Sequence, residues 1–463
     1  MSDCIKLVFR GAAYTVTGSC TQVSYHHQNI LIDCGLFQGP KEIRDLNWKR
    51  IMDISKIDAI ILTHAHVDHS GLIPKVVHQG FNGPIYCSSG TRTLSEVILP
   101  DAAHLQEEDA KYANSSGYSH HKPALPLYTT EDAKKALRQF KTLELERWIE
   151  ILPGVSCRLI HSGHILGSTF VQLSLDTNLG PKIITFSGDI GSKCGHILRP
   201  PKSILETDYL ILESTYGDRV HPQNNVENRL EEVVHYIEKS NGVLVIPAFS
   251  VGRTQEVLYL IRELEKKNKI SQLPVYLDSP MAIEATNAYL KYPEELKLVD
   301  TGGPIKSNLS TTKFHAVCSN QESISLNAKS GPMIIISAAG MLTGGRVLHH
   351  LKKRLPDHRN AVLFVGYQAE GTKGKLLQNG LSTIRIHHEE TPVNARIFTL
   401  EGLSAHADSN EMMEWLSKFQ RLPTLTFLNH GEKNSLETLA YRIRHQLKID
   451  VQIPHLNEEI KLQ

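Results

Sequence analysis

The sequence predicts an α/β protein with more than one domain, and three observations carry this prediction. The chain has 463 residues, which is more than one hydrophobic core usually organises. Its first 200 residues alternate short apolar runs with turns, a pattern typical of a mixed sheet with helices outside it. After Pro200 and Pro201, strands and helices alternate regularly, which predicts a parallel sheet covered on both faces.

Apolar runs bounded by turn residues predict the strands of the first part. These strands cover residues 5–9, 21–25, 30–33, 59–62, 157–160, 169–175 and 182–187. A helical repeat of apolar residues predicts two helices, over 94–114 and 130–140.

In the second part, strands and helices are expected in turn. The predicted strands are 209–212, 243–246, 274–277, 333–337, 361–365, 395–400, 424–428 and a short final strand. The predicted helices are 253–267, one beginning at 281, 345–354, 410–419 and 437–447. Residues 300–330 are polar and weakly patterned, so we expect an excursion there.

The composition excludes several classes of protein. Apolar residues make up 41% of the chain and the formal net charge is +1, so the chain is globular and any nucleic-acid contact must be local. The seven cysteines are scattered without a C-x-x-C pair, which argues against disulfides and fits a cytoplasmic protein. No signal peptide is evident and no apolar run reaches the length of a membrane span, so we expect no membrane contact.

The most informative segment places three histidines and one aspartate directly after the apolar run 57–62. These residues are His64, His66, Asp68 and His69. Imidazole and carboxylate suit zinc, and a zinc site with an open position generates hydroxide at neutral pH. The spacing allows His64 and His66 to share one metal while Asp68 and His69 turn toward a second. With 24 histidines some clustering arises by chance, but this pattern at a strand end is narrow.

A two-metal site needs further ligands and a bridging carboxylate. Candidates that follow predicted strands are His164, Asp189 and His430, and Asp33 is suited to hold a ligand ring in place. Each of them alone is more often a cap or a turn former. Together they complete one ligand set.

This pattern resembles the metallo-β-lactamase superfamily, and the resemblance implies an αββα sandwich with two zinc ions per chain. In that resemblance, His64, His66 and His164 bind one zinc. Asp68, His69 and His430 bind the other, and Asp189 bridges the two.

Three later motifs resemble the β-CASP nucleases of the same superfamily. Residues 212–219 with Glu213 look like motif A, residues 402–408 with His406 look like motif B, and residues 428–432 look like motif C. The resemblance covers nearly the whole chain and implies a metallo-β-lactamase domain in two parts, 1–205 and 393–463, around an inserted parallel-sheet β-CASP domain, 206–392. Within that family the chain is similar to the RNA-processing branch, which contains the pre-mRNA 3′-end endonuclease. It resembles the compact bacterial form of this branch. The DNA-repair branch has valine at the motif B position, where this chain has His406.

The expected function is therefore a zinc-dependent ribonuclease that hydrolyses single-stranded RNA with a metal-bound hydroxide. The expected catalytic residues are Asp68, Asp189, Glu213 and His406. His406 suits a general acid, because a carboxylate such as Glu213 would hold it protonated. Glu213 as a capping or surface acid is the plainer alternative. Endonuclease activity, with or without 5′–3′ exonuclease activity, and a homodimer are both compatible with the motifs.

Three turns of the insert suggest phosphate contacts, because glycine-rich turns at helix starts attract anions. The candidates are Ser250, Arg253, Ser337, Arg346, Lys373 and Lys375. Ordinary α/β turns are an equal alternative for each. The histidine pairs 26–27, 120–121, 349–350 and 387–388 lack a strand-end context, and we expect them at the surface.

Two other functions compete with this hypothesis. One is a small-molecule ester or thioester hydrolase of the same superfamily, against which the insert, motif A and His406 argue. The other is a non-catalytic RNA-binding or scaffolding module, against which the complete set of ligands argues.

Overall fold

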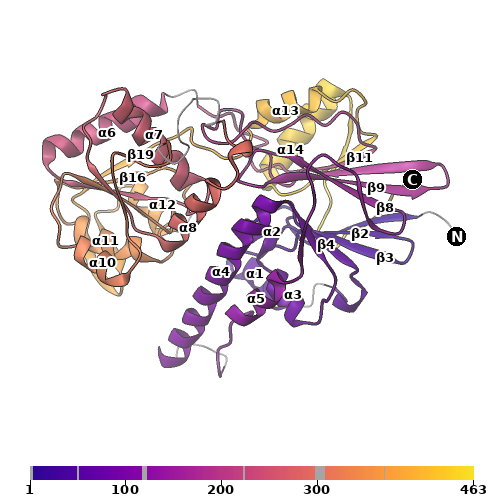
Figure 1. Cartoon of the computed structure of the whole chain (residues 1–463), viewed down its shortest axis with the longest axis horizontal. Coiled ribbons are helices and arrows are strands. Elements are labelled where there is room, and N and C mark those ends of the chain that lie inside the picture. The colour runs from indigo at the N-terminus through magenta and orange to yellow at the C-terminus, as the bar shows by residue number, and fades with distance from the viewer. Residues whose placement is uncertain are drawn as a thin grey trace. The chain divides into compact units, whose positions relative to one another are not determined.

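The computed structural model describes residues 4–49, 52–116, 122–222, 225–297, 308–369 and 371–462 (Figure 1). The chain forms two compact units. The first unit comprises Met1–Lys193, Pro200–Val220 and His406–Gln463, and the second comprises Cys194–Arg199 and His221–Ala405.

The first unit contains two seven-stranded sheets. In order across the first sheet lie β22 (Glu459–Leu462), β1 (Ile5–Phe9), β2 (Thr21–Tyr25), β3 (Gln28–Ile32), β4 (Ala59–Ile61), β5 (Ile85–Cys87) and β6 (Phe140–Thr142). In order across the second lie β21 (Asp450–Gln452), β20 (Leu425–Leu428), β11 (Tyr209–Leu212), β10 (Gly180–Phe186), β9 (Thr169–Thr177), β8 (Val155–His161) and β7 (Ile149–Leu152). One buried apolar cluster, with Leu7 and Ile32 of the first sheet and Leu159 and Leu173 of the second, joins the facing sheets.

Helices cover the outer face of each sheet in this unit (Figure 1). A second apolar cluster packs α3 (Ile73–His78), α4 (Ser89–Ser116) and α5 (Thr130–Leu137) against the first sheet. A third packs α13 (Ser409–Ser417) and α14 (Lys433–Arg442) against the second sheet. The remaining short helices are α1 (Lys41–Arg44), η1 (Asp45–Trp48), η2 (Ile54–Lys56), α2 (Val67–Ser70) and η5 (Ile443–Leu447). The predicted αββα sandwich is confirmed.

The second unit contains a six-stranded sheet in which each neighbouring pair is parallel. In order across it lie β14 (Lys313–Ala316), β13 (Pro274–Leu277), β15 (Met333–Ser337), β12 (Val243–Pro247), β16 (Ala361–Phe364) and β19 (Arg396–Thr399). Helices α6 (Val226–Ser240), α7 (Arg253–Lys266) and α8 (Pro280–Tyr289) pack with one apolar cluster of this sheet. Helices α10 (Asn320–Leu326), α11 (Arg346–Arg354) and α12 (Lys373–Gln378) pack with the other. Figure 1 shows α6 and α7 on the opposite side of the sheet from α10 and α11. The unit also has η3 (Pro293–Glu295) and a hairpin of β17 (Thr383–Ile386) and β18 (Glu389–Pro392). The predicted parallel sheet, covered on both faces, is confirmed.

Several elements differ from those expected. Helix α6 is absent from the prediction although Leu230, Val233 and Ile237 recur at helical spacing and are buried. The excursion predicted over 300–330 holds β14 and α10 in its described part, and β14 lacks an apolar signal because it is a largely exposed edge strand. The helix expected over 130–140 ends at Leu137, since Phe140 begins β6.

Strand β11 pairs in parallel with both β10 and β20, so residues 209–212 contribute to the first unit. In the part of the chain that the structure describes, no helix combines the length and the apolar character needed to cross a bilayer.

Candidate metal centre

Loops that follow strands of both sheets bring the predicted ligands together in the first unit. His64 and His66 follow β4, and Asp68 and His69 lie on α2 directly after them. His164, Asp189 and His430 follow β8, β10 and β20 of the second sheet. Strands β10, β11 and β20 run in parallel, so their carboxyl ends meet at one edge. The backbone N–H of Thr169 donates to the carbonyl of Thr63 at 3.0 Å and ties the two sheets together beside that edge.

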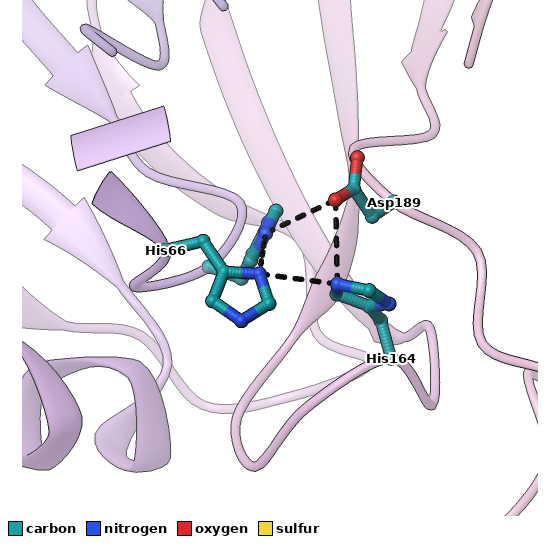
Figure 2. Close-up of side chains that lie close together, drawn as sticks. His66, His164 and Asp189 are labelled. Atoms are coloured by element: carbon teal, nitrogen blue, oxygen red, sulfur yellow. Dashed lines mark hydrogen bonds and ion pairs between the residues drawn. The ribbon is translucent and has the colours of Figure 1, made fainter. Parts of the chain in front are cut away.

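His64, His66, His164 and Asp189 form the first group, in which one ligand atom from each residue lies within 4.8 Å of the others. The Nδ1 atom of His66 lies 3.2 Å from Nε2 of His64 and 3.1 Å from Nε2 of His164. Figure 2 shows His66, His164 and Asp189 turned toward a common point. Three imidazoles and one carboxylate converging in this way match the ligand set of a zinc ion.

Asp68, His69 and His430 form the second group, again within 4.8 Å. The Nε2 atom of His430 lies 3.6 Å from Oδ2 of Asp68. His69 and His430 are buried and their rings lie 4.8 Å apart, at an angle of 52°. This set also has the composition of a zinc site.

Asp189 faces both groups, one with each carboxylate oxygen. Its Oδ2 lies 3.4 Å from Nε2 of His64 and 3.3 Å from Nε2 of His164. Its Oδ1 lies 3.2 Å from Nε2 of His69 and 3.5 Å from Nδ1 of His430. A carboxylate in this position is able to bridge two cations.

Three buried atoms at the centre make no hydrogen bond within the described part of the chain: Nε2 of His69, Oδ1 of Asp189 and Nε2 of His430. An unsatisfied buried polar atom is costly unless a cation or water binds it. The Nδ1 atom of His69 lies 2.7 Å from Oδ2 of Asp33, and a carboxylate only accepts hydrogen bonds. Nδ1 therefore donates to Asp33, and Nε2 is the ring nitrogen that faces the centre and that a metal ion would bind in place of a proton, so the residues fit a metal ion.

The charges around the centre favour the same conclusion. Burial is the main cause that lowers the pKa of His64, of His164 and, to about 3, of His66, so these rings are neutral and able to bind a metal. Burial opposes the charged form of Asp189, yet the neighbouring histidines, His69 first, lower its pKa well below the usual range. Burial also opposes a charge on His69, but Asp189 and Asp33 raise the pKa of its ring. The carboxylates thus create a negative field that attracts a cation.

Thr63 and Asp33 hold ligands of both groups. The Thr63 hydroxyl lies 2.9 Å from Oδ2 of Asp33 and 3.0 Å from Nδ1 of His64. Since Asp33 only accepts, the hydroxyl donates to Asp33 and accepts from His64, which leaves Nε2 of His64 for a metal. The backbone N–H of Thr63 donates to Oδ1 of Asp33 at 2.8 Å. The sequence prediction includes Asp33 but gives Thr63 no role, although its place between a strand end and the first histidine was a usable signal.

His406 and Glu213 form a pair beside the first group. Glu213 follows β11, and His406 precedes α13 in an isolated bridge with Gly191. The Nδ1 atom of His406 lies 3.3 Å from Oε1 of Glu213, which also accepts from the backbone of Ile190 at 2.7 Å. The Glu213 side chain is fully buried, whereas 20% of the His406 side chain is exposed. Burial works against a charge on His406, but Glu213 and Asp189 outweigh it and raise its pKa to about 9.

The predicted phosphate contacts lie at one edge of the second unit's sheet. Their turns follow β12, β15 and β16, which are neighbouring parallel strands. Ser250 is buried beside Ser279, while Arg253, Lys373 and Lys375 are half-buried. The role of these residues stays a prediction.

Arg346 and Ser337 take part in an internal hydrogen-bond network. Arg346 donates to Oδ1 of Asp278 at 2.7 Å and to Oδ1 of Asn320 at 2.8 Å, and also to two backbone carbonyls. The Ser337 hydroxyl donates to the carbonyl of Asp278 at 2.8 Å. Their polar groups take part in hydrogen bonds within the unit that the sequence prediction does not include, and their contact with phosphate stays a prediction.

His350 corrects a further prediction. Its ring is fully buried, with Nε2 2.6 Å from Oδ2 of Asp278 and Nδ1 2.8 Å from Oδ1 of Asn327. The surface position expected for it is wrong, because the internal carboxylate of Asp278 supplies a partner. His349 and the pairs 26–27 and 387–388 are exposed as predicted, and residues 120–121 lie outside the described residues.

The sequence of this chain matches known protein families in three consecutive parts. Three family profiles match: the metallo-β-lactamase superfamily over residues 14–210, the β-Casp domain over residues 254–377, and the Zn-dependent metallo-hydrolase RNA specificity domain over residues 390–454. Ribonuclease TTHA0252 of Thermus thermophilus is 34% identical over 441 residues, which is 94% of this chain and 95% of that protein. Transcription termination factor FttA of Methanocaldococcus jannaschii is 32% identical, over 97% of this chain and 70% of that protein.

One solved structure, of a protein of unknown function from Enterococcus faecalis, superposes with a TM-score of 0.55. It is 14% identical and covers 99% of this chain and 100% of that one, so it concerns the fold alone. The two relatives match this chain over nearly its whole length, and about a third of the matched residues are identical. With the profile matches, this similarity shows that the chain belongs to the β-CASP family of the metallo-β-lactamase superfamily and is a metal-dependent hydrolase.

Proposed function

We propose that the chain is a two-zinc ribonuclease that cuts single-stranded RNA internally. The observation that carries the proposal is the position of Asp189, whose two oxygens face two separate groups of ligands. The RNA specificity profile and the name of the ribonuclease relative support RNA as the substrate. All seven cysteines are free, which supports a reducing cytoplasm as its location.

The proposed ligands divide into two sets that share Asp189. The first set is His64, His66 and His164, and the second is Asp68, His69 and His430. When bound, zinc ions supply Lewis acidity and lower the pKa of water, which phosphodiester hydrolysis needs at neutral pH. Asp33 and Thr63 orient the ligand rings, so the set is held before metal arrives.

His406 is the proposed general acid. Its Nδ1 faces Glu213, and its other ring nitrogen, Nε2, is the atom proposed to donate a proton to the leaving oxygen. Glu213 is held in place by the backbone N–H groups of Ile190 and Thr215, at 2.7 and 3.3 Å. It keeps the ring both oriented and protonated. The exposed part of His406 leaves it within reach of a substrate.

The test is cleavage of a single-stranded RNA carrying a different label at each end, with the purified chain before and after removal of metal. We expect internal fragments from both ends, no cleavage after chelation, and recovery when zinc returns. Mononucleotides released first from the 5′ end would instead show trimming. Turnover of small esters or thioesters without RNA cleavage would overturn the proposal in favour of a small-molecule hydrolase.

A further inference from the structure

A pair of stacked aromatic rings in the first unit has no part in the chemistry described so far. Tyr14 lies in the loop 11–19, directly after β1, and His455 lies in the turn between β21 and β22. Their ring centroids are 5.1 Å apart and their planes differ by 18°. The rings come from opposite ends of the chain, so only the fold brings them together.

The loop that carries Tyr14 is fixed to residues of the metal centre at both ends. The backbone N–H of His430 donates to the carbonyl of Ala12 at 2.9 Å. At the other end, the N–H of Ser19 donates to the carbonyl of Asp68 at 2.8 Å. Two extended residues span at most about 7 Å, so Tyr14 begins within that distance of Ala12, which contacts His430. The loop that carries Tyr14 is therefore tied to the backbone of two residues of the second group, Asp68 and His430.

The neck of this loop is closed tightly. A Cβ atom on Gly11 would lie 1.7 Å from the carbonyl oxygen of Gly18, so the two backbone segments touch where only glycine fits. The side chain of Asn429, next to His430, donates to the carbonyl of Gly11 at 3.1 Å. These contacts hold the loop in one shape.

The backbone of the loop is strained where it presents the ring. Ala12 has φ 56° and Tyr14 has φ 57°, in the left-handed region that non-glycine residues rarely occupy. Such strain persists only where surrounding contacts enforce it, and it concentrates at binding and catalytic sites. A bulky tyrosine held in this conformation points to a role for its position.

The turn that carries His455 is anchored as firmly. The N–H of Asn457 donates to the carbonyl of Phe9 at 2.7 Å, and Phe9 N–H donates to the carbonyl of Glu458 at 3.2 Å. The N–H of His455 itself donates to Oε2 of Glu458 at 2.7 Å. These hydrogen bonds hold the turn of His455 against the end of β1, where the loop of Tyr14 begins.

The two rings differ in exposure. Tyr14 is half-buried and packs on the apolar cluster that includes Leu428 and Leu436. His455 is exposed and its ring stacks on Tyr14, so the pair is accessible from outside the unit. The order from the core outward is thus the apolar cluster, Tyr14, and then His455.

We propose that this pair is a stacking platform for one base of single-stranded RNA, close to the bond that is cut. The proposal rests on the proposed ribonuclease function and names a substrate contact for it. Proteins that bind single strands stack bases on aromatic rings, and each stack strengthens binding without selecting one base. A pre-ordered platform places the chain of RNA at little cost in conformational freedom.

The chain offers a matched control in a second stacked pair. Tyr441 and His445 have ring centroids 4.0 Å apart at 26°, in the same unit and also exposed. Tyr441 lies in the last turn of α14 and His445 in the following η5, about three helical turns or more beyond His430. This pair has the same chemistry without the proximity to the metal centre.

The test measures binding of a short single-stranded RNA that carries 2-aminopurine at successive positions, with a His406→Ala background to prevent cleavage. Stacking quenches 2-aminopurine, so the quenched position shows which base meets the platform. We expect His455→Ala to weaken binding about five- to a hundred-fold and to abolish the quenching at one position. His455→Phe, which keeps a flat ring, should retain both, and His445→Ala should change neither.

Zinc content of each variant is measured in parallel, because a merely structural role would lower it. The platform would be overturned if His455→Ala bound RNA and quenched 2-aminopurine as the His406→Ala background protein does. It would also be overturned if His445→Ala lost as much affinity and quenching as His455→Ala. Loss of zinc from His455→Ala would show that the pair supports the ligands instead. If the wild-type chain cleaves RNA while His455→Ala binds normally, only this inference fails, whereas a wild-type chain that neither binds nor cleaves RNA removes the proposed function itself.

Discussion

The Nδ1 atom of His406 lies 3.3 Å from Oε1 of Glu213, although 193 positions separate them in the sequence. If His406 is a general acid and not a ligand, His406→Ala should keep its zinc and lose cleavage by about a hundred- to ten-thousand-fold. Elemental analysis and single-turnover cleavage measure the two effects. His27→Ala, an exposed histidine of the same unit, serves as the control. A substrate with a better leaving group, such as a phosphorothiolate, should restore cleavage by His406→Ala, and loss of a zinc would contradict the assigned role.

Glu213→Gln should change the pH profile of cleavage in one direction. Glu213 raises the pKa of His406, which reaches about 9 in the folded chain, so the acid form is present below that pH and is lost above it. Removing the charge lowers this pKa, and the alkaline decline in cleavage should move to lower pH. The profile is measured with single-turnover rates across neutral and alkaline buffers. A decline that stays in place, or moves upward, would show that Glu213 does not hold the proton on His406.

Asp189→Ala should lose more zinc than replacement of a ligand that faces one group. Its two oxygens face His64 and His164 on one side and His69 and His430 on the other, so the change removes a ligand from both sites. Elemental analysis of protein purified without chelator should approach two equivalents in the wild type. Asp176→Ala, an exposed carboxylate on β9, should match the wild type. A wild-type content near zero that zinc addition does not raise would contradict the two-metal centre.

Thr63→Val should weaken zinc binding about ten- to a hundred-fold, the usual effect of losing a residue that orients a ligand. Valine has the shape of threonine but removes the hydroxyl that lies 2.9 Å from Asp33 and 3.0 Å from His64. Thr63→Ser keeps that hydroxyl and should stay close to the wild type. Competition with a zinc-binding dye measures the affinity. Equal affinities for the valine and serine variants would show that the hydroxyl does not position the ring.

Asp278→Asn should lower the free energy of unfolding of the second unit by about 3–5 kcal/mol, because it breaks a buried ionic network. Asp278 accepts from Arg346, His350 and Ser323. Burial opposes its charge, but these donors, His350 first, lower its pKa below the ordinary value of 3.8. Its contribution is therefore present above pH 4 and disappears as the pH falls through the lowered pKa.

The measurement is unfolding of chelated wild-type and variant protein at several pH values. The difference in free energy of unfolding between the wild type and Asp278→Asn should be constant near neutral pH and should become smaller in strong acid. Asp357→Asn is the control, because Asp357 pairs with Arg359 at the surface and such pairs contribute at most about 1 kcal/mol. A difference for Asp278→Asn no larger than for this control would contradict the prediction.

Replacing Lys373 and Lys375 together by alanine should weaken RNA binding and flatten its dependence on salt. Each lysine that contacts a phosphate adds to the slope of affinity against salt, since it releases bound counterions. Binding is measured over a range of salt concentrations. Alanine at Lys239 and Lys267, two exposed lysines of the same unit, controls for the loss of two charges. An equal slope in both double variants would show that RNA does not follow the turn at residues 371–375.

The sequence alone was enough to locate the segments whose side chains meet at the candidate metal centre. His64, His66, Asp68 and His69 follow one strand within six consecutive positions, and the residues that complete the cluster each follow a strand of their own. Ligands at strand ends are predictable because parallel strands bring their carboxyl ends to one edge. The strand–helix alternation of the second unit and its parallel sheet were also predictable from the sequence, because both depend on local apolar periodicity.

Other features depend on which side chains meet across the fold. His350 and Arg346 contact the buried carboxylate of Asp278. The sequence around a histidine or an arginine does not indicate that such a partner exists. The two directions of the Asp189 oxygens and the stack of Tyr14 on His455 likewise join segments that are far apart in the chain. Burial, hydrogen bonding and ring contact are properties of the surroundings of a residue. Local periodicity determined the elements of this protein, and only the packing of those elements decided which polar side chains are free for chemistry and which hold the fold.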